Sequence, residues 1–304
     1  MALRGIFPIL LIPFDADGRI DEASLRHVVQ FELQGKPDGL GVCGFASEAY
    51  KLSEAERLRC AEIVADEVGE RVPLIIGMSA GGTELAIEQA HQYARLKPAA
   101  LMVLPPSTMV YGDEALVEHY VALGNAANCP IMVQQSPHIP GFNAGTLSVE
   151  SLAEIARRSS NICYFKIEGA GSAERIGALK QKVSPQIGLF GGVGGIAVRD
   201  EWKAGAAGLL PGCGFNEYFV QAWRAWDKGD YHTAETALKT VQPLVDAVSG
   251  KGHEFSLHAR KYLLHRAGII AHPYVRRPTV HVEPTELENV LHIADSLNLQ
   301  INRV

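Results

Sequence analysis

Asn161-Ile162-Cys163-Tyr164-Phe165-Lys166-Ile167-Glu168 is an apolar run with one lysine inside it. Such a run predicts a buried strand. A lysine in that setting gives up hydration, which favours its neutral amine. Because a neutral amine attacks carbonyl carbon, the position suits a lysine that forms a Schiff base. The alternative is a lysine at the mouth of the strand whose amine reaches water.

This run is the sixth of a series, because short apolar runs alternate with longer amphipathic ones up to about residue 228. Ser53-Glu54-Ala55-Glu56 is a capping box that opens one intervening helix, and Thr83 and Asp113 open two others. Eight strands, each followed by a helix, predict an α/β fold of the (β/α)8 TIM-barrel type. A doubly wound sheet is the rival, but it normally has fewer strands, and no linker divides this chain. The predicted strands are residues 5–12, 39–43, 73–78, 99–104, 130–135, 162–167, 187–191 and 208–211.

The pattern changes after residue 228, where no further strand is predicted. Residues 230–249, 253–267 and 284–299 have the composition and spacing of helices. We therefore expect a barrel over residues 1–228 and a C-terminal helical extension over residues 229–304. The extension should pack on the barrel, so that the two form one structural domain.

Composition excludes several classes of protein. The chain of 304 residues is long enough for one barrel, and its net charge of −6 without a basic cluster argues against nucleic acid as a partner. No apolar run approaches the ~20 residues that span a bilayer, so no membrane partner is expected. Residues 1–14 contain Pro8 and Pro13 and are interpreted as a first strand, not a signal peptide. Five cysteines without paired spacing fit a reducing cytoplasm.

Barrel enzymes carry their chemistry at the C-terminal ends of the strands. Gly191-Gly192-Val193-Gly194-Gly195 follows one strand, and Gly192-x-Gly194-x-x-Ala197 matches a loose dinucleotide fingerprint, but the chain lacks two mononucleotide-binding halves. No HExxH motif is present, so we expect no metal. The strand ends of interest are residues 44–48, 104–108, 134–137, 166–168, 191–195 and 210–214.

The chain resembles the dihydrodipicolinate synthase/N-acetylneuraminate lyase family. The resemblance rests on Lys166 at the end of the sixth strand, on Gly44-x-x-x-Glu48 after the second, on Pro130-Ile131 and Pro137 around the fifth, and on the C-terminal helices. It extends from Gly5 to about Asn298. It implies a class I Schiff-base barrel that acts on pyruvate or another 2-keto acid without a cofactor and assembles as a homo-oligomer, a dimer or tetramer.

By this resemblance Lys166 is the catalytic lysine and Glu48 the glutamate of the second turn. The family's adjacent hydroxyl residues, which hold the substrate carboxylate, are replaced here by Phe45 and Ala46. Backbone N–H groups around Ala46 and Ser47, with the Ser47 hydroxyl, are then expected to bind the carboxylate. The alternative is that Ser47 is an ordinary turn residue.

Further departures separate the chain from dihydrodipicolinate synthases. Gln134 stands where the family has a proton-relaying tyrosine, and Ile139 stands where the synthases have an arginine. The aromatic residue after the fourth strand is also missing, with Pro105-Pro106-Ser107-Thr108 in its place. Three segments resemble dehydratases of 2-keto-3-deoxy sugar acids, 2-keto-3-deoxy-L-arabonate in particular: residues 130–134, 164–168 and 261–278.

The remaining site residues are expected around this core. Gln134, Gly192 and Leu210 should line the mouth with Ala46 and Ser47, and Glu48 and Ser107 should lie behind them. An imine on Lys166 acidifies the C3–H bond, after which loss of the C4 hydroxyl gives dehydration. Retro-aldol cleavage needs a base on that hydroxyl, so the missing tyrosine favours a dehydratase. A pyruvate-dependent aldolase and a keto-acid-binding pseudoenzyme stay open, and water, Ser47 or the freed Lys166 are possible proton carriers.

Overall fold

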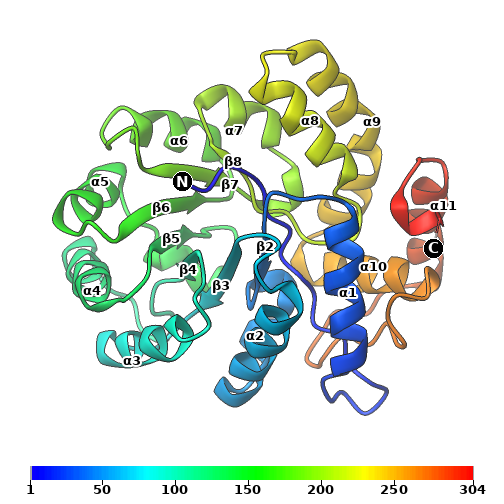
Figure 1. Ribbon diagram of the computed structural model, residues 1–304, viewed down its shortest axis with the longest axis horizontal. Helices are drawn as coiled ribbons and strands as arrows, with labels where there is room; N and C mark the ends of the chain where they lie inside the picture. Colours follow the sequence, from blue (N-terminus) through cyan, green and yellow to red (C-terminus); the bar gives the residue numbers. More distant parts are fainter. Residues whose placement is uncertain (1, 304) are drawn as a thin grey trace. The chain divides into compact units, whose positions relative to one another are not determined.

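The computed structural model describes residues 2–303. Within them, one sheet contains eight strands, and helices surround it (Figure 1). Their order is β1-β8-β7-β6-β5-β4-β3-β2, beginning with β1 (Gly5–Ile6) and ending with β2 (Leu40–Val42). Ile9, which follows β1, forms a parallel bridge with Gly41 of β2. The row therefore closes on itself, and the predicted (β/α)8 barrel with C-terminal helices is confirmed.

The chain divides into two compact units. The first comprises the chain up to Arg4 together with Pro73–Leu210. Parallel strands alternate in it with helices that lie outside the strands (Figure 1). Its strands are β3 (Leu74–Met78), β4 (Ala100–Val103), β5 (Ile131–Gln135), β6 (Ile162–Ile167), β7 (Gly188–Gly191) and β8 (Gly208–Leu209). Its helices are α3 (Thr83–Ala94), α4 (Asp113–Ala126), α5 (Val149–Arg158), α6 (Ser172–Lys180) and α7 (Val198–Ala204).

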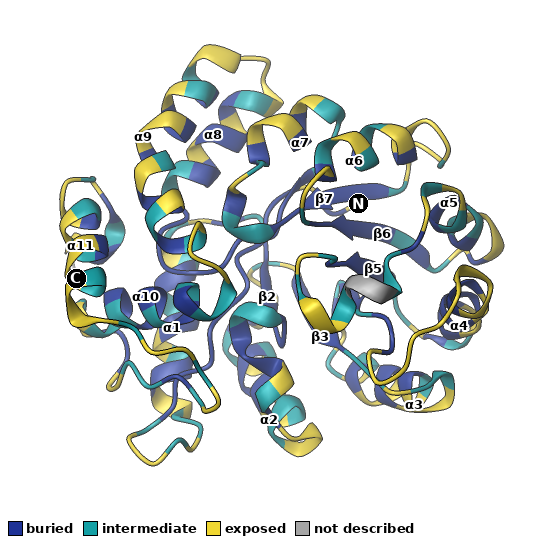
Figure 2. Cartoon of the chain, turned by 180° about the vertical axis from the view of Figure 1, so that it is seen from behind, coloured by how far each residue is buried: buried dark blue, intermediate teal, exposed yellow. Residues whose placement is uncertain are grey.

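The strands of this unit form because their side chains are buried on both faces. Every residue of β3, β4, β5 and β7 is buried, which explains the near-continuous apolar runs of the sequence (Figure 2). The helices bury one face and expose the other. Thr83 and Asp113 begin α3 and α4 as predicted.

The second unit comprises Gly5–Val72 and the described chain from Pro211 onward. Ser53 caps α2, and the capping box with Glu56 is confirmed. The predicted C-terminal helices are also present, but the last ends at Asp295 instead of residue 299. Besides β1 and β2, the unit contains α1 (Glu22–Gln34), α2 (Glu54–Val68), α8 (Glu217–Asp227), α9 (Tyr231–Ser249), α10 (His253–Arg266) and α11 (Pro284–Asp295).

The first strand is shorter than predicted. Regular pairing covers Gly5–Ile6 alone, and the rest of residues 5–12 contributes the isolated bridges of Ile9 to Gly41 and Gly212. Pro8 has no N–H to donate to a ladder, which explains the interruption. The eighth strand likewise stops before Pro211. The proposed division of the chain at residue 228 stays a prediction.

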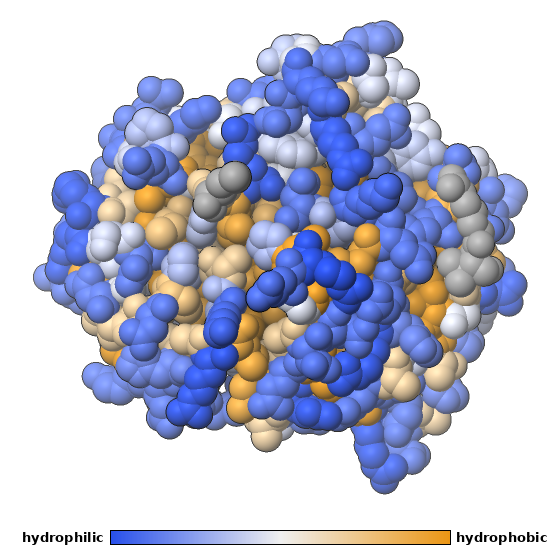
Figure 3. Space-filling view, in the orientation of Figure 1, coloured by the Kyte–Doolittle hydropathy of each residue, from blue (hydrophilic) through white to orange (hydrophobic). Residues whose placement is uncertain are grey.

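No helix within residues 2–303 is both long and apolar enough to span a bilayer. Hydrophilic and hydrophobic side chains are interspersed over the face drawn in Figure 3.

Candidate active site

Strand β6 holds Lys166 in the interior of the first unit. Its side chain is 5% exposed. Successive strand residues point to opposite faces, so Lys166 shares its face with Tyr164 and Glu168. In the sheet register Lys166 lies beside Gln134 of β5 and Phe190 of β7. Lys166 and Gln134 are therefore neighbours in the sheet.

Glu168 completes this cluster, although it was not among the predicted site residues. Its Oε1 lies 3.3 Å from the Lys166 Nζ and accepts the Val193 N–H at 3.0 Å. Its Oε2 accepts the Gln134 amide at 2.8 Å and the Ser136 hydroxyl at 2.5 Å. A carboxylate with four such contacts is held in one orientation.

The charge of Lys166 keeps Glu168 ionised despite its burial. Burial alone would raise the pKa of Glu168, because a carboxylate loses solvation in the protein interior. The positive charge of Lys166, with His138 and the hydrogen bonds of Ser136 and Gln134, outweighs burial and lowers that pKa to about 2. Glu168 is therefore ionised at neutral pH.

The Lys166 amine has few partners of its own. Among residues 2–303, its one polar contact is the ion pair with Glu168. An ammonium group carries three N–H donors, so most of its hydrogen-bonding capacity is unused by the protein. This leaves the amine available to a bound carbonyl compound.

The segment after β7 covers Glu168 with backbone. A Cβ at Gly192 would lie 2.1 Å from Glu168 Oε1, so only glycine leaves room for the carboxylate there. Val193 has a φ of +48°, in the left-handed region that non-glycine residues rarely adopt. That conformation accompanies the N–H bond from Val193 to Glu168. Leu210 is buried and donates its N–H to the Gly191 carbonyl at 3.1 Å.

In the second unit, the turn after β2 forms two short 3₁₀ helices, Phe45–Ser47 and Ala49–Lys51, joined by Glu48 at a φ of +54°. Ser47 is fully buried, and its hydroxyl donates to the Leu10 carbonyl at 2.5 Å. Its N–H donates to Gly44. To bind a substrate carboxylate, Ser47 would have to exchange one of these bonds.

Glu48 belongs to a second buried ion pair. Its Oε1 accepts from the Lys261 Nζ at 2.5 Å, and its Oε2 accepts the Arg276 N–H at 3.0 Å and lies 3.3 Å from the Lys51 Nζ. Lys261 also donates to the Tyr274 carbonyl at 2.8 Å. Burial lowers the pKa of Lys261 to about 8, although the Glu48 carboxylate opposes that shift.

The structure thus gathers the predicted residues into two groups. Lys166, Gln134 and Gly192 meet around Glu168 in the first unit, and Ser47 and Glu48 are adjacent in the second with Ala46 half-buried beside them. Ser107 is exposed between β4 and α4. The substrate-binding roles of these residues stay predictions.

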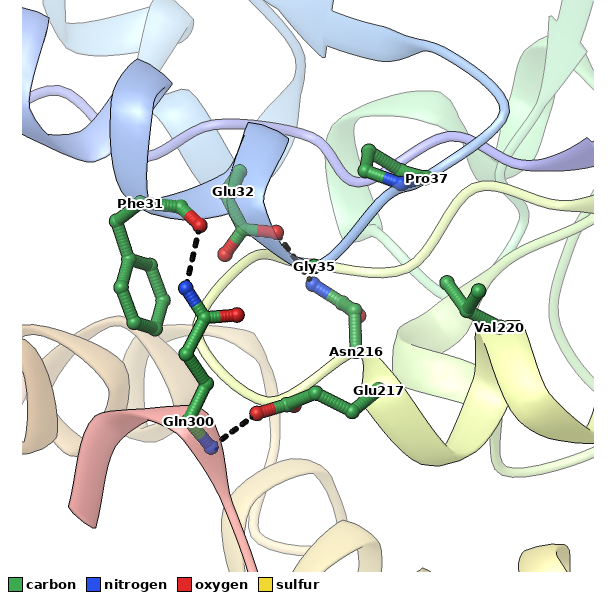
Figure 4. A pocket seen from close by; sticks show the side chains of 8 residues that line it. All are labelled: Phe31, Glu32, Gly35, Pro37, Asn216, Glu217, Val220 and Gln300. Atoms are coloured by element: carbon green, nitrogen blue, oxygen red, sulfur yellow. Dashed lines mark hydrogen bonds between the residues drawn. The ribbon is translucent and has the colours of Figure 1, made fainter. Parts of the chain in front are cut away.

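The cavity in Figure 4 belongs to the second unit and contains none of the predicted site residues. Its volume of ≈ 10 Å³ is at the lower limit of what can hold one water molecule. Within residues 2–303, no group of three or more His, Cys, Asp and Glu side chains is arranged to hold a metal ion. The lining residues are Phe31, Glu32, Gly35, Pro37, Asn216, Glu217, Val220 and Gln300.

Comparison with known proteins identifies the family. The model of the dihydrodipicolinate synthetase family matches residues 2–297. The chain belongs to this family. It is 29% identical over 299 residues to the L-2-keto-3-deoxyarabonate dehydratase of Azospirillum brasilense, across 97% of this chain and 94% of the relative. It is 26% identical to the N-acetylneuraminate lyase of Escherichia coli, across 97% of both chains.

The solved structures support the fold. The crystal structure of dihydrodipicolinate synthase from Rhodopseudomonas palustris superimposes with a TM-score of 0.85 at 23% identity, across 97% of both chains. Members of the dihydrodipicolinate synthetase family are lyases that include a dehydratase and an aldolase-type lyase, and the predicted membership and enzyme class are confirmed.

The sequence analysis pointed to the strand ends at 134–137 and 166–168 but assigned no role to Ser136 or Glu168. A signal was present, because a residue two positions after Lys166, just past the end of β6, continues the same face of the strand. The same holds for Ser136, just past the end of β5, and Gln134. Applying the alternation to both strands would have placed all four side chains together. Glu201 of α7, described below, could not have been found from such a pattern, because its place depends on how the helix packs.

Proposed function

We propose that the protein is a lysine Schiff-base lyase that dehydrates a 2-keto-3-deoxy sugar acid. The observation that carries the proposal is the buried Lys166–Glu168 pair. Its amine, which has a single polar contact, lies 3.3 Å from an oriented carboxylate. An amine beside a carboxylate supplies a nucleophile and a proton carrier within reach of one small molecule.

Lys166 opens the reaction by attack of Nζ on the C2 ketone. The ketone oxygen leaves as water, and an iminium forms between C2 and Nζ. The positive nitrogen withdraws electrons from C3, which acidifies its C–H bond. Glu168 pairs with Lys166 before the reaction, and the same geometry lets its carboxylate stabilise the iminium charge.

Glu168 is the proton carrier that the sequence left unassigned. Its carboxylate takes the C3 proton, and the resulting enamine expels the C4 hydroxyl, which leaves as water with that proton. Gln134 and Ser136 both donate to the same oxygen of Glu168 and fix its direction. Water then hydrolyses the imine and frees Lys166.

Dehydration is favoured over retro-aldol cleavage because cleavage needs a base on the C4 hydroxyl. The amide of Gln134 occupies the family's tyrosine position and cannot take a proton. Its bond to Glu168 directs it to the carboxylate that acts at C3. Similarity to the L-2-keto-3-deoxyarabonate dehydratase along nearly the whole chain supports the same choice. The chemistry requires no metal or organic cofactor, and we further propose a homo-oligomeric assembly.

Borohydride trapping tests this function. The protein would be incubated with pyruvate and with a panel of 2-keto-3-deoxy pentonates and hexonates, reduced, and read by intact mass. We expect a covalent adduct in wild type and none in Lys166→Ala. The exposed Lys180 of α6 is the matched control, and Lys180→Ala should trap as wild type does.

Product analysis without borohydride separates the alternatives. A product lighter than the substrate by one water supports dehydration, whereas pyruvate plus an aldehyde identifies an aldolase. Trapping without turnover of any panel member identifies a binding protein. Condensation of pyruvate with aspartate semialdehyde should be poor, because Ile139 and Gln134 replace the residues that synthases use. An adduct that maps to another lysine would overturn the assignment of Lys166.

A further inference from the structure

Glu201 is a buried carboxyl that the proposed reaction does not use. It lies on α7, is 1% exposed, and accepts the Ser172 hydroxyl on Oε1 at 2.7 Å. Its Oε2 has no hydrogen-bond partner within residues 2–303. Burial raises the pKa of Glu201 to about 7, opposed by Ser172 and reinforced by the negative charge of Glu168. The group therefore changes charge near neutral pH.

The backbone of two glycines separates Glu201 from the proposed active site. A Cβ at Gly191 would lie 1.7 Å from Glu201 Oε2, and a Cβ at Gly192 would lie 2.1 Å from Glu168 Oε1. Consecutive residues in extended backbone face opposite sides. The two carboxyls consequently lie on opposite sides of the Gly191–Gly192 segment, with no side chain between them.

The charges around Glu201 come from few elements. Lys166 of β6 and Glu168, just after that strand, act on it, and Asp200 precedes it on α7. Helix α6 contributes the uncharged Ser172, and β7 has no titratable side chain. His138 in turn acts on Glu168. Two carboxylates so placed disfavour each other's ionisation, and each favours the charged form of a nearby amine.

We propose that Glu201 is a positioning residue that holds a proton behind the Gly191–Gly192 segment and sets the charge state of the Lys166–Glu168 pair. When Glu201 is protonated, Glu168 is the sole carboxylate that acts on Lys166 from this cluster. When Glu201 ionises, a second negative charge retains the proton on the Lys166 amine and slows imine formation. This inference rests on the proposed role of Lys166 as the imine-forming residue.

The test is the rate of imine formation with pyruvate, trapped by borohydride from about pH 5.5 to about pH 9. Glu201→Gln is nearly isosteric and permanently neutral, so its profile should reach half-maximum about one pH unit below that of wild type. Ser172→Ala removes a donor that favours the charged carboxylate, so its profile should shift in the same direction. The exposed Lys203→Gln on the same helix is the control and should change the midpoint little.

Two readouts distinguish the possible failures. If wild type and Glu201→Gln both trap pyruvate and their pH profiles have the same midpoint, the proposed role of Glu201 is overturned. The proposed Schiff base on Lys166 would be unaffected by that result. No adduct in wild type would instead reject the proposed function and the coupling with it. Infrared difference spectra of wild type against Glu201→Gln follow the carboxyl proton itself, and a Glu201 ionised throughout that pH range would also overturn the proposal.

Discussion

Two buried lysine–glutamate pairs, one in each unit, have opposite surroundings. Lys166 pairs with Glu168 at 3.3 Å and makes no other polar contact within residues 2–303. Lys261 pairs with Glu48 at 2.5 Å, donates to the Tyr274 carbonyl, and lies 4.1 Å from the centroid of the Phe14 ring. The second amine thus donates two hydrogen bonds and faces an aromatic ring, whereas the first has a single polar contact.

The difference shows that pKa alone does not identify a nucleophile. Burial lowers the pKa of Lys261 to about 8, which by itself would nominate it for Schiff-base chemistry. Its side chain is 0% exposed, however, and a substrate would have to displace the Glu48 and Tyr274 contacts to reach it. Unused hydrogen-bonding capacity therefore supports the proposal that Lys166 is the reactive lysine, whereas Lys261 links α10 to the turn at Glu48.

The largest expected effect is that of Glu168→Gln. The amide keeps the size of the side chain but cannot take the C3 proton, so turnover should fall by about 10²–10⁴-fold. Borohydride trapping of pyruvate should persist, because the amine of Lys166 remains. Glu174→Gln on the exposed face of α6 is the control. If Glu168→Gln turns over substrate at the wild-type rate, another group must transfer the proton.

Lys261→Met should produce the opposite pattern. It leaves the buried Glu48 carboxylate without its main partner, so the free energy of unfolding should fall by about 3–5 kcal/mol. Urea denaturation measures that loss, and the folded fraction should still trap pyruvate. Lys251→Met removes an exposed ion pair with Glu286 and should cost at most about 1 kcal/mol. Loss of trapping by folded Lys261→Met would break the contrast between the two lysines.

The buried carboxyls Glu32 and Glu168 have opposite effects on how stability changes with pH. Burial raises the pKa of Glu32 to about 7, although Gly214 and Asn216 donate to it, as seen for Asn216 in Figure 4. The unfolded chain releases the Glu32 proton above its ordinary pKa of 4.5, whereas the folded protein retains that proton up to about pH 7. The free energy of unfolding therefore falls as the pH rises from 4.5 to about 7. Glu168, with its lowered pKa, contributes stability above 4.5 that is lost as pH falls toward 2.

Glu32→Gln removes the contribution of Glu32 to the pH dependence of stability. The variant should lose less stability than wild type between about pH 5 and about pH 8, by about 3 kcal/mol. Urea denaturation at both pH values measures the difference. Equal losses in the two proteins would mean that Glu32 is ionised throughout.

The sequence predicted the barrel because its strands are buried on both faces and therefore appear as uninterrupted apolar runs. It predicted Lys166 for the same reason, since a charge inside such a run is conspicuous. It overextended the first strand, because Pro8 breaks a ladder without changing the hydropathy of the run. Glu201 escaped prediction because the direction of a helical side chain depends on tertiary packing, and a lone glutamate in a helix is an ordinary surface residue.

The smallest effect should be that of Ser47→Ala, and it decides between two interpretations of the turn after β2. The sequence predicts that Ser47 binds the substrate carboxylate, whereas the structure shows its hydroxyl donating to Leu10. Removing one buried hydrogen bond costs about 1–3 kcal/mol in either case. If the bond serves the substrate, KM should rise by roughly 5- to 150-fold at unchanged stability. If it serves the fold, the free energy of unfolding should fall while KM is unchanged. The helix-cap control Ser53→Ala should show that second pattern, with a loss of about 1 kcal/mol.

Gln134→Ala is the companion variant. Because the Gln134 amide donates to Glu168, its removal should lower kcat and leave KM unchanged. A rise in KM for Gln134→Ala with kcat preserved would move Gln134 from the proton carrier to substrate binding.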